Sequence, residues 1–172
     1  MSMQTWEELI NGSLSDATAV TATGEQLLVP DFSVPANYMY PGRILRARLS
    51  GKISNIVTTP GTLTVRCRWG GLAGTILVAS AAMVMNTVAQ TDDQWELEMR
   101  IACRALGTLM TSGRIIRGNH TTPGLVDLIP ASAGAQVTGL TMNAATNLSF
   151  TAQFSLTGNS MTCQQYDLES QS

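Results

Sequence analysis

Residues 43–54, RILRARLSGKIS, show the clearest structural pattern of the chain. Apolar or small residues occupy every second position on one side of it, namely Leu45, Ala47, Leu49, Gly51 and Ile53. Polar residues occupy the positions between them, namely Arg46, Arg48, Ser50 and Lys52. A period of two is the side-chain period of a β-strand, whereas a helix repeats at about 3.6 residues. The pattern therefore predicts a strand with one face on a core and the other in water.

Three further segments show the same alternation, at residues 62–69, 94–104 and 148–156. The inward positions of the four segments give the predicted core: Leu45, Leu49, Leu63, Val65, Trp69, Trp95, Leu97, Ile101, Phe150 and Phe154. Weaker strand patterns follow at residues 72–79, 82–88, 109–116, 136–142 and 161–168. Turn-forming residues separate them, and residues 117–134 are expected to form a long loop. Many short strands with almost no helical period predict an all-β antiparallel sandwich or barrel.

The first 24 residues differ from the rest of the chain. Thr5 and Glu8 fit a capping box, and Trp6, Leu9 and Ile10 would then share one face of a short helix. A helix this short is unstable alone, so we expect it to dock on a partner. Residues 13–24 are rich in Ser, Thr and Ala and are expected to form an extended arm. The predicted division is thus a docking helix and arm over residues 1–24 and a β domain over residues 25–172.

Composition excludes several classes of protein. Charged residues make up 13% of the 172 residues, against roughly 25% in an average domain, and the formal net charge is −2. A net negative charge disfavours binding to the phosphates of nucleic acids. The longest nearly apolar run, residues 76–85, is about half the length that a membrane-spanning helix needs. No export signal is expected at the start of the chain.

The sequence offers little for catalysis or for binding a metal or cofactor. His120 is the only histidine, and it lies between polar residues. Cys67, Cys103 and Cys163 are far apart and lack the spacing of a zinc site. Neither a dinucleotide-binding motif nor a phosphate loop is present. We therefore expect no enzymatic activity, no metal and no cofactor.

Charged residues alternate with the predicted core positions on several strands. They are Arg46, Arg48, Arg66, Arg68, Glu96, Glu98, Arg100 and Arg104. One interpretation is a cross-strand ladder of opposite charges that fixes the strand register. The other is a subunit interface, because nine of the ten basic residues are Arg and Arg is enriched at protein contacts where Lys is depleted.

Several segments carry a resemblance to a known family. They are PANYMYPGRILR at residues 35–46, GKISNIVTTPGTLT at 51–64, WEL at 95–97, NLSFTAQFS at 147–155 and NSMTCQQYDLE at 159–169. These segments resemble structural proteins of tailed bacteriophages. The resemblance implies a single jelly-roll domain, commonly a homotrimer on the capsid exterior or part of a fibre.

Two functions follow from this resemblance as expectations. The first is a trimeric capsid decoration, or cement, protein that is made in the bacterial cytoplasm and binds the major capsid protein or another virion protein. Trp6, Leu9 and Ile10 would then dock on that partner. The alternative is a head-fibre or tail-associated module whose loops, especially residues 117–134, recognise a receptor or a glycan. Neither function involves nucleic acid or a membrane.

Overall fold

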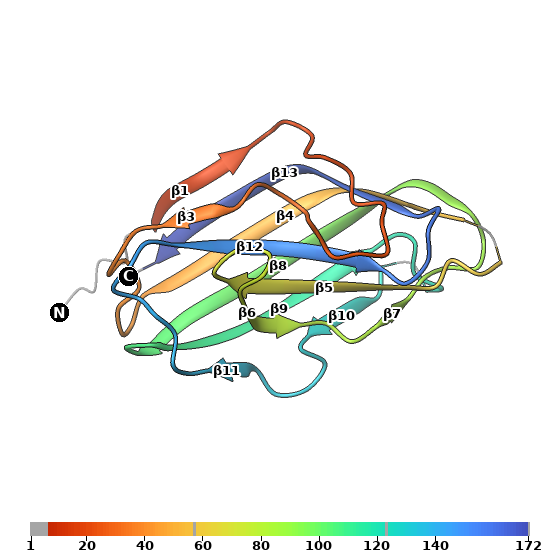
Figure 1. The fold of residues 1–172 in the computed structure, drawn as a ribbon. Helices are drawn as coiled ribbons and strands as arrows, with labels where there is room; N and C mark the ends of the chain where they lie inside the picture. The colour runs from red at the N-terminus through yellow and green to blue at the C-terminus, as the bar shows by residue number, and fades with distance from the viewer. Residues whose placement is uncertain (1–6, 57, 123, 172) are drawn as a thin grey trace.

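The structure, a computed structural model, describes residues 7–56, 58–122 and 124–171. These residues form an all-β sandwich and contain no helix (Figure 1). The strands are β1 (Glu7–Ser13), β2 (Gln26–Leu27), β3 (Phe32–Val34), β4 (Ile44–Asn55), β5 (Thr62–Trp69), β6 (Thr75–Ala79), β7 (Met83–Val84), β8 (Gln90–Ala105), β9 (Thr108–Arg117), β10 (Val126–Ile129), β11 (Ala135–Val137), β12 (Thr146–Phe154) and β13 (Ser160–Gln171).

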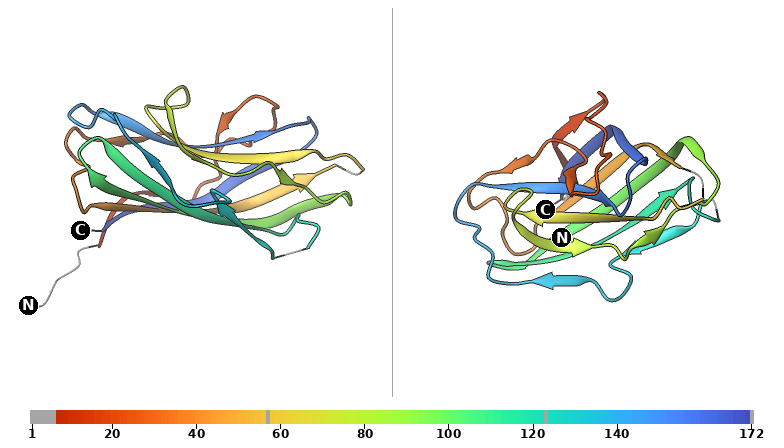
Figure 2. Two further views of the ribbon diagram at one scale, coloured as in Figure 1. Left: turned by 90° about the horizontal axis from the view of Figure 1, so that it is seen from below. Right: turned by 45° about the vertical axis from the view of Figure 1, so that its right-hand side comes forward.

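The strands form two antiparallel sheets that pack as two layers, as the left view of Figure 2 shows. Sheet A has the order β1-β13-β4-β8-β9-β10, and β11 also pairs with β9. Sheet B has the order β2-β12-β5-β6, while β3 pairs with β12 and β7 with β5. Strands β4, β5, β8 and β12 contain the four segments whose alternation is clearest in the sequence.

Between the described strands the chain changes sheet six times, and two of these crossings run from β4 to β5 and from β12 to β13. Asn159 joins the two crossings, because its Nδ2 donates to the Pro60 carbonyl at 2.7 Å and its Oδ1 accepts from the Ile56 amide at 3.3 Å. The Thr62 amide also donates to Ser155 Oγ at 2.8 Å. These side-chain bonds take the place of the sheet ladder where the backbone leaves it.

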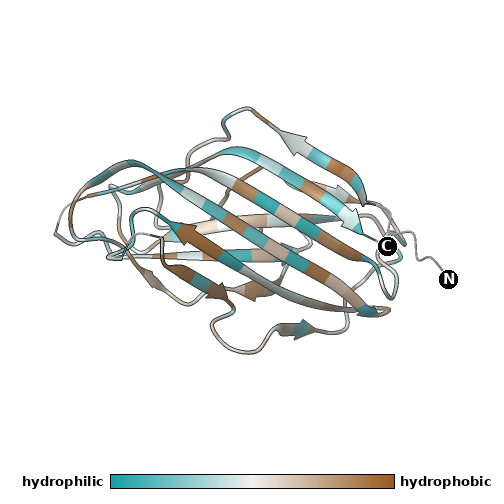
Figure 3. Cartoon of the chain, turned by 180° about the vertical axis from the view of Figure 1, so that it is seen from behind, coloured by the Kyte–Doolittle hydropathy of each residue, from teal (hydrophilic) through white to brown (hydrophobic). Residues whose placement is uncertain are grey.

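The core lies between the two sheets and is built from the inward positions of the long strands. All ten core residues predicted from the sequence are buried there. Figure 3 looks onto sheet A and shows apolar and polar residues alternating along its strands. Phe32, from the short strand β3, packs edge to face on both Phe150 and Tyr166, at 5.7 Å and 5.4 Å between ring centroids.

The N-terminal helix is not found in the described residues. Leu9 and Ile10 belong to strand β1, which pairs antiparallel with β13, and Trp6 lies outside the described residues. Leu9 is exposed, whereas Ile10, at a register shift in the ladder, packs against the core. The physical reason is that pairing with β13 gives this segment backbone hydrogen bonds on both sides of the register shift, whereas an isolated helix of one to two turns is only marginally stable.

The arm that follows β1 is part of the sandwich. The Ala17 amide donates to the Cys163 carbonyl at 2.7 Å, and Val20 forms a two-way bridge with Met161. Val20 is completely buried. The chain before residue 25 therefore supplies both a strand and a core side chain to the β domain that was expected to begin at that residue.

Candidate functional site

A row of alternating charges crosses the outer face of sheet A. The strand register places Asp167 of β13 opposite Arg48 of β4, Arg48 opposite Glu98 of β8, and Glu98 opposite Arg114 of β9. The four side chains share one face because each lies between inward-facing residues of its own strand. Directly opposed charges of opposite sign favour this register over a slip of one residue.

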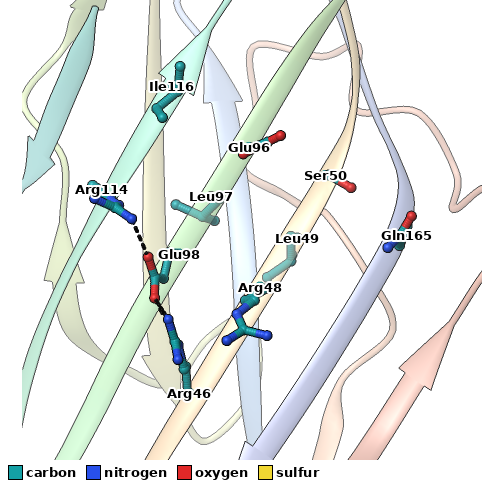
Figure 4. Close-up of a pocket in the computed structure, with 10 residues that line it drawn as sticks. All are labelled: Arg46, Arg48, Leu49, Ser50, Glu96, Leu97, Glu98, Arg114, Ile116 and Gln165. Carbon is teal, nitrogen blue, oxygen red and sulfur yellow. Dashed lines mark hydrogen bonds and ion pairs between the residues drawn. The ribbon is translucent and has the colours of Figure 1, made fainter.

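Glu98 is the centre of this row. Its Oε1 accepts hydrogen bonds from both Nε and Nη2 of Arg46, the first at 2.8 Å, and its Oε2 lies 2.9 Å from Arg114 Nη2 (Figure 4). The hydrogen bonds from Arg46 hold the pKa of Glu98 below its ordinary value, against the opposing effect of burial, and Arg114 adds to the lowering. Glu98 therefore stays ionised between two guanidinium groups.

Arg48 turns the other way, toward β13. Its Nη1 lies 3.8 Å from Glu169 Oε1 and 4.0 Å from Asp167 Oδ2. Burial raises the pKa of Asp167, repulsion from Glu169 raises it further, and Arg48 only partly offsets both effects. Two carboxylates here share one nearby arginine, so this end of the row is less fully neutralised than the Glu98 end.

The row borders a shallow depression of about 370 Å³, shown in Figure 4. Its lining residues come from β4, β8, β9 and β13, and they are Arg46, Arg48, Leu49, Ser50, Glu96, Leu97, Glu98, Arg114, Ile116 and Gln165. It holds paired charges and one hydroxyl, but no histidine or thiol that could serve as a base or nucleophile. This arrangement can bind a complementary polar surface.

The structure separates Arg66 and Arg68 from this row and places them on the outer face of sheet B. Glu25, at the end of the arm, lies over both of them. Arg68 makes two parallel bonds to Glu25, Nε to Oε1 and Nη2 to Oε2, each of 2.7 Å, and Arg66 Nη1 lies 3.4 Å from Oε2. Glu25 was not predicted from the sequence, because the arm before it has no periodicity that would indicate which strand it covers.

This second cluster is largely sealed from water. The side chains of Arg68 and Glu25 are only 15% and 17% exposed, and Thr151, which donates to Glu25, is completely buried. The hydrogen bond from Arg68 lowers the pKa of Glu25, with further lowering by Thr151 and Arg66 and an opposing effect of burial. The cluster fastens the arm to sheet B and leaves little surface for a partner.

The remaining charged candidates lie on β8 without such pairing. Glu96 accepts a hydrogen bond from Gln94 Nε2 at 3.1 Å. Arg100 and Arg104 are exposed, and in the described part of the chain neither lies within ion-pair distance of a carboxylate. These two arginines extend the positive charge of the outer face of sheet A toward the β8–β9 turn.

The residues considered for catalysis have structural surroundings. His120 Nδ1 accepts the Thr122 amide at 2.9 Å within a turn. All three cysteines are buried and free, and burial raises the pKa of Cys163 to about 11. Across residues 7–56, 58–122 and 124–171, His, Cys, Asp and Glu nowhere gather in a group of three that could hold a metal ion.

The described ranges hold no helix with the length and apolar character needed to cross a bilayer. The chain was also compared with protein-family models, with curated proteins and with solved structures, and none of them matches it. The two outer faces of the sandwich and the residues that they present are the features that bear on function.

Proposed function

We propose that this chain is a structural subunit of a bacteriophage virion, a trimeric decoration protein that binds the major capsid protein and stabilises the head. The observation that carries the proposal is the outer face of sheet A. It is broad and rich in arginine, and no other described strand covers it. Arg48 and Arg114 remain about half exposed on this face even though each contacts a carboxylate. Such a face suits a complementary charged surface better than a small-molecule substrate.

The sandwich topology is compatible with a jelly-roll origin. In sheet A the last strand of the chain, β13, returns to lie beside β4, as the returning strand of a Greek key lies beside the first. Strand β5 follows β4 in the chain, and β12 precedes β13. Because β4 pairs with β13 in sheet A and β5 pairs with β12 in sheet B, the same two stretches of chain pair first in one layer and then in the other. Jelly rolls combine two such keys in two sheets. We therefore propose a jelly-roll-type domain.

Attachment through several copies explains how an exposed ionic face could hold firmly. Single ion pairs on a surface contribute little, about 0–1 kcal/mol each. A trimer presents three copies of the face at once, and linked weak contacts combine into durable attachment. The small formal net charge of −2 keeps repulsion between neighbouring copies small.

A binding experiment with one matched pair of variants tests the proposal. Heads of the virus that encodes the chain, prepared without this protein, should bind the purified wild type in co-sedimentation. Ser50→Arg places a bulky cation in the depression on sheet A without removing an ion pair, and it should abolish binding. Thr64→Arg makes the same change to an outward hydroxyl of sheet B and should leave binding intact.

Other outcomes would count against a decoration protein. Equal binding by both variants would show that sheet A is not the docking face. No binding by the wild type, together with saturable binding on a glycan array, would favour a receptor-recognition module of a fibre or tail. Antibodies against the chain that label heads in electron micrographs would support decoration, and labelling confined to tails would contradict it.

A further inference from the structure

We infer that copies of this chain associate edge to edge, with β10 of one copy pairing with β1 of the next, so that sheet A continues between subunits. The inference deepens the proposed homo-oligomer and rests on it. It names the contact, the orientation and the residues, which the proposed function leaves open.

Strand β10 is an edge that the fold leaves open and apolar. Within the described residues it pairs only with β9, and Leu125, Val126 and Leu128 beside or on it are exposed, Leu128 by 61%. Its one charged residue, Asp127, is turned away, with Oδ2 3.0 Å from Nη2 of the buried Arg117. Soluble proteins usually protect such edges with charge or proline, because every second backbone amide points outward and can pair with another strand.

Strand β1 is the opposite edge of the same sheet and is open in the same way. Its only partner in the described part of the chain is β13. Leu9 is 66% exposed, and Leu14, directly after the strand, is exposed even more. Figure 1 shows the two edges on opposite sides of the molecule, with β13, β4, β8 and β9 between them. Each edge therefore offers apolar side chains beside free backbone groups.

Strand direction permits the two edges to pair. Every ladder along the path β1-β13-β4-β8-β9-β10 is antiparallel, so β1 and β10, at the ends of six strands, run in opposite directions. Two copies set side by side in the same orientation thus bring β10 and β1 together as an antiparallel pair, the pairing used throughout the sheet.

Charge favours this contact over a symmetric one. Arg114, 57% exposed, lies directly across from Leu128 beside the β10 edge. Glu169 lies directly across from Leu9 beside the β1 edge, and the exposed Glu8 lies on β1 itself. Pairing β10 with β1 brings arginine toward glutamate, whereas pairing β10 with a second β10 brings the two Arg114 residues together. When β10 of one copy pairs with β1 of the next, the first copy keeps a free β1 edge and the second keeps a free β10 edge. Further copies can add in the same way, and the series can close into a ring.

The test uses sedimentation of the full chain and three variants. Leu128→Glu adds a negative charge that faces Arg114 within the chain and the acidic β1 edge of the next copy. Leu9→Lys adds a positive charge that faces Glu169 within the chain and Arg114 of the next copy. Each should weaken self-association by about tenfold or more. Leu106→Glu, at a residue that is 76% exposed in the β8–β9 turn, is the matched control and should self-associate like the wild type.

Mixing the variants distinguishes the two geometries. Leu128→Glu keeps an intact β1 edge and Leu9→Lys keeps an intact β10 edge, so a mixture of the two should recover association that neither shows alone. Association by Leu9→Lys alone at the wild-type level, with no gain when Leu128→Glu is added, would overturn the proposal in favour of symmetric β10 pairing. A wild type that sediments as a monomer but still labels virion heads would overturn the edge contact and leave the virion role standing. Unchanged circular dichroism in each variant shows that the fold is intact.

Discussion

The two outer faces of the sandwich use the same kinds of residue and put them to different uses. On sheet B, Arg66 and Arg68 are covered by Glu25 and are mostly hidden from water. On sheet A, Arg48 and Arg114 contact carboxylates of neighbouring strands and remain about half exposed. The difference shows that the segment covering a strand decides whether its outward arginines form a largely buried ion pair or stay at the surface.

The reason lies in the path of the chain before β4. The arm pairs with β13 near Val20 and then passes to sheet B, where Glu25 and Asp31 reach outward-facing hydroxyls and guanidinium groups of β5 and β12. No described segment takes a similar path across sheet A. Sheet A is therefore the face that a partner can reach, and the following changes test the contrast.

Glu25→Ala should have the largest effect. It removes the carboxylate that accepts two bonds from Arg68 and leaves two guanidinium groups partly buried without a counter-charge. We expect the free energy of unfolding to fall by about 2–3 kcal/mol, in line with loss of hydrogen bonds to a charged group. Urea unfolding measures it, and a fall under about 0.5 kcal/mol, the size of an ordinary surface pair, would show that the face is not sealed.

Stability against acid should depend on Glu25. Because its folded pKa is lowered, the ionised group stabilises the fold above its ordinary pKa of 4.5, and that stabilisation is lost as the pH falls through the folded value. Glu25→Gln should therefore be less stable than the wild type at neutral pH and should lose less stability on acidification. Urea midpoints on both sides of pH 4.5 check this, and parallel curves for the two proteins would contradict it.

Glu98→Gln should have a smaller effect that depends on salt. The pKa of Glu98 is also lowered, but its partners Arg46 and Arg114 lie on an exposed face. We expect a loss of about 0.5 kcal/mol at low ionic strength, which added salt reduces by screening. The loss in Glu25→Gln should persist in salt. Equal salt dependence of the two variants would remove the distinction between the faces.

Asp167→Asn should have the smallest effect and the opposite sign. Because the pKa of Asp167 is raised, mainly by burial, its ionised form is disfavoured in the fold above its ordinary pKa of 3.8. The neutral amide should therefore stabilise the protein at neutral pH by a few tenths of a kcal/mol, and the gain should vanish below pH 3.8. Thermal unfolding at both pH values measures it, and destabilisation at neutral pH would show that the contact with Arg48 outweighs burial.

Much of the fold could be predicted from the sequence, because alternation is a local property. The strands β4, β5, β8 and β12 and their buried positions, such as Leu45 and Phe150, follow from period two alone. Strand β10 was missed inside the loop expected over residues 117–134, since four residues are too few to show a period. The helix containing Leu9 and Ile10 was wrong in the described residues, because a capping motif reports local preference and cannot sense the open edge of β13.

Part of the candidate site could be predicted in the same way. Arg46, Arg48 and Glu98 were identified as charges on the polar faces of their strands, and the structure brings them together. Asp167 and Arg114 complete the row, but they lie on strands whose patterns in the sequence are weaker.

Local sequence is enough to predict long half-buried strands with arginine-rich outer sides, since the period of two and the residue types are both read locally. Which of those sides meet water depends on contacts between segments that are distant in the chain. Glu25 is more than 40 residues from Arg66 and Arg68 along the chain, and sheet order alone sets Glu98 beside Arg114. Contacts between distant segments depend on how the sheets close around the core, and a pattern of neighbours along the chain carries no information about that closure.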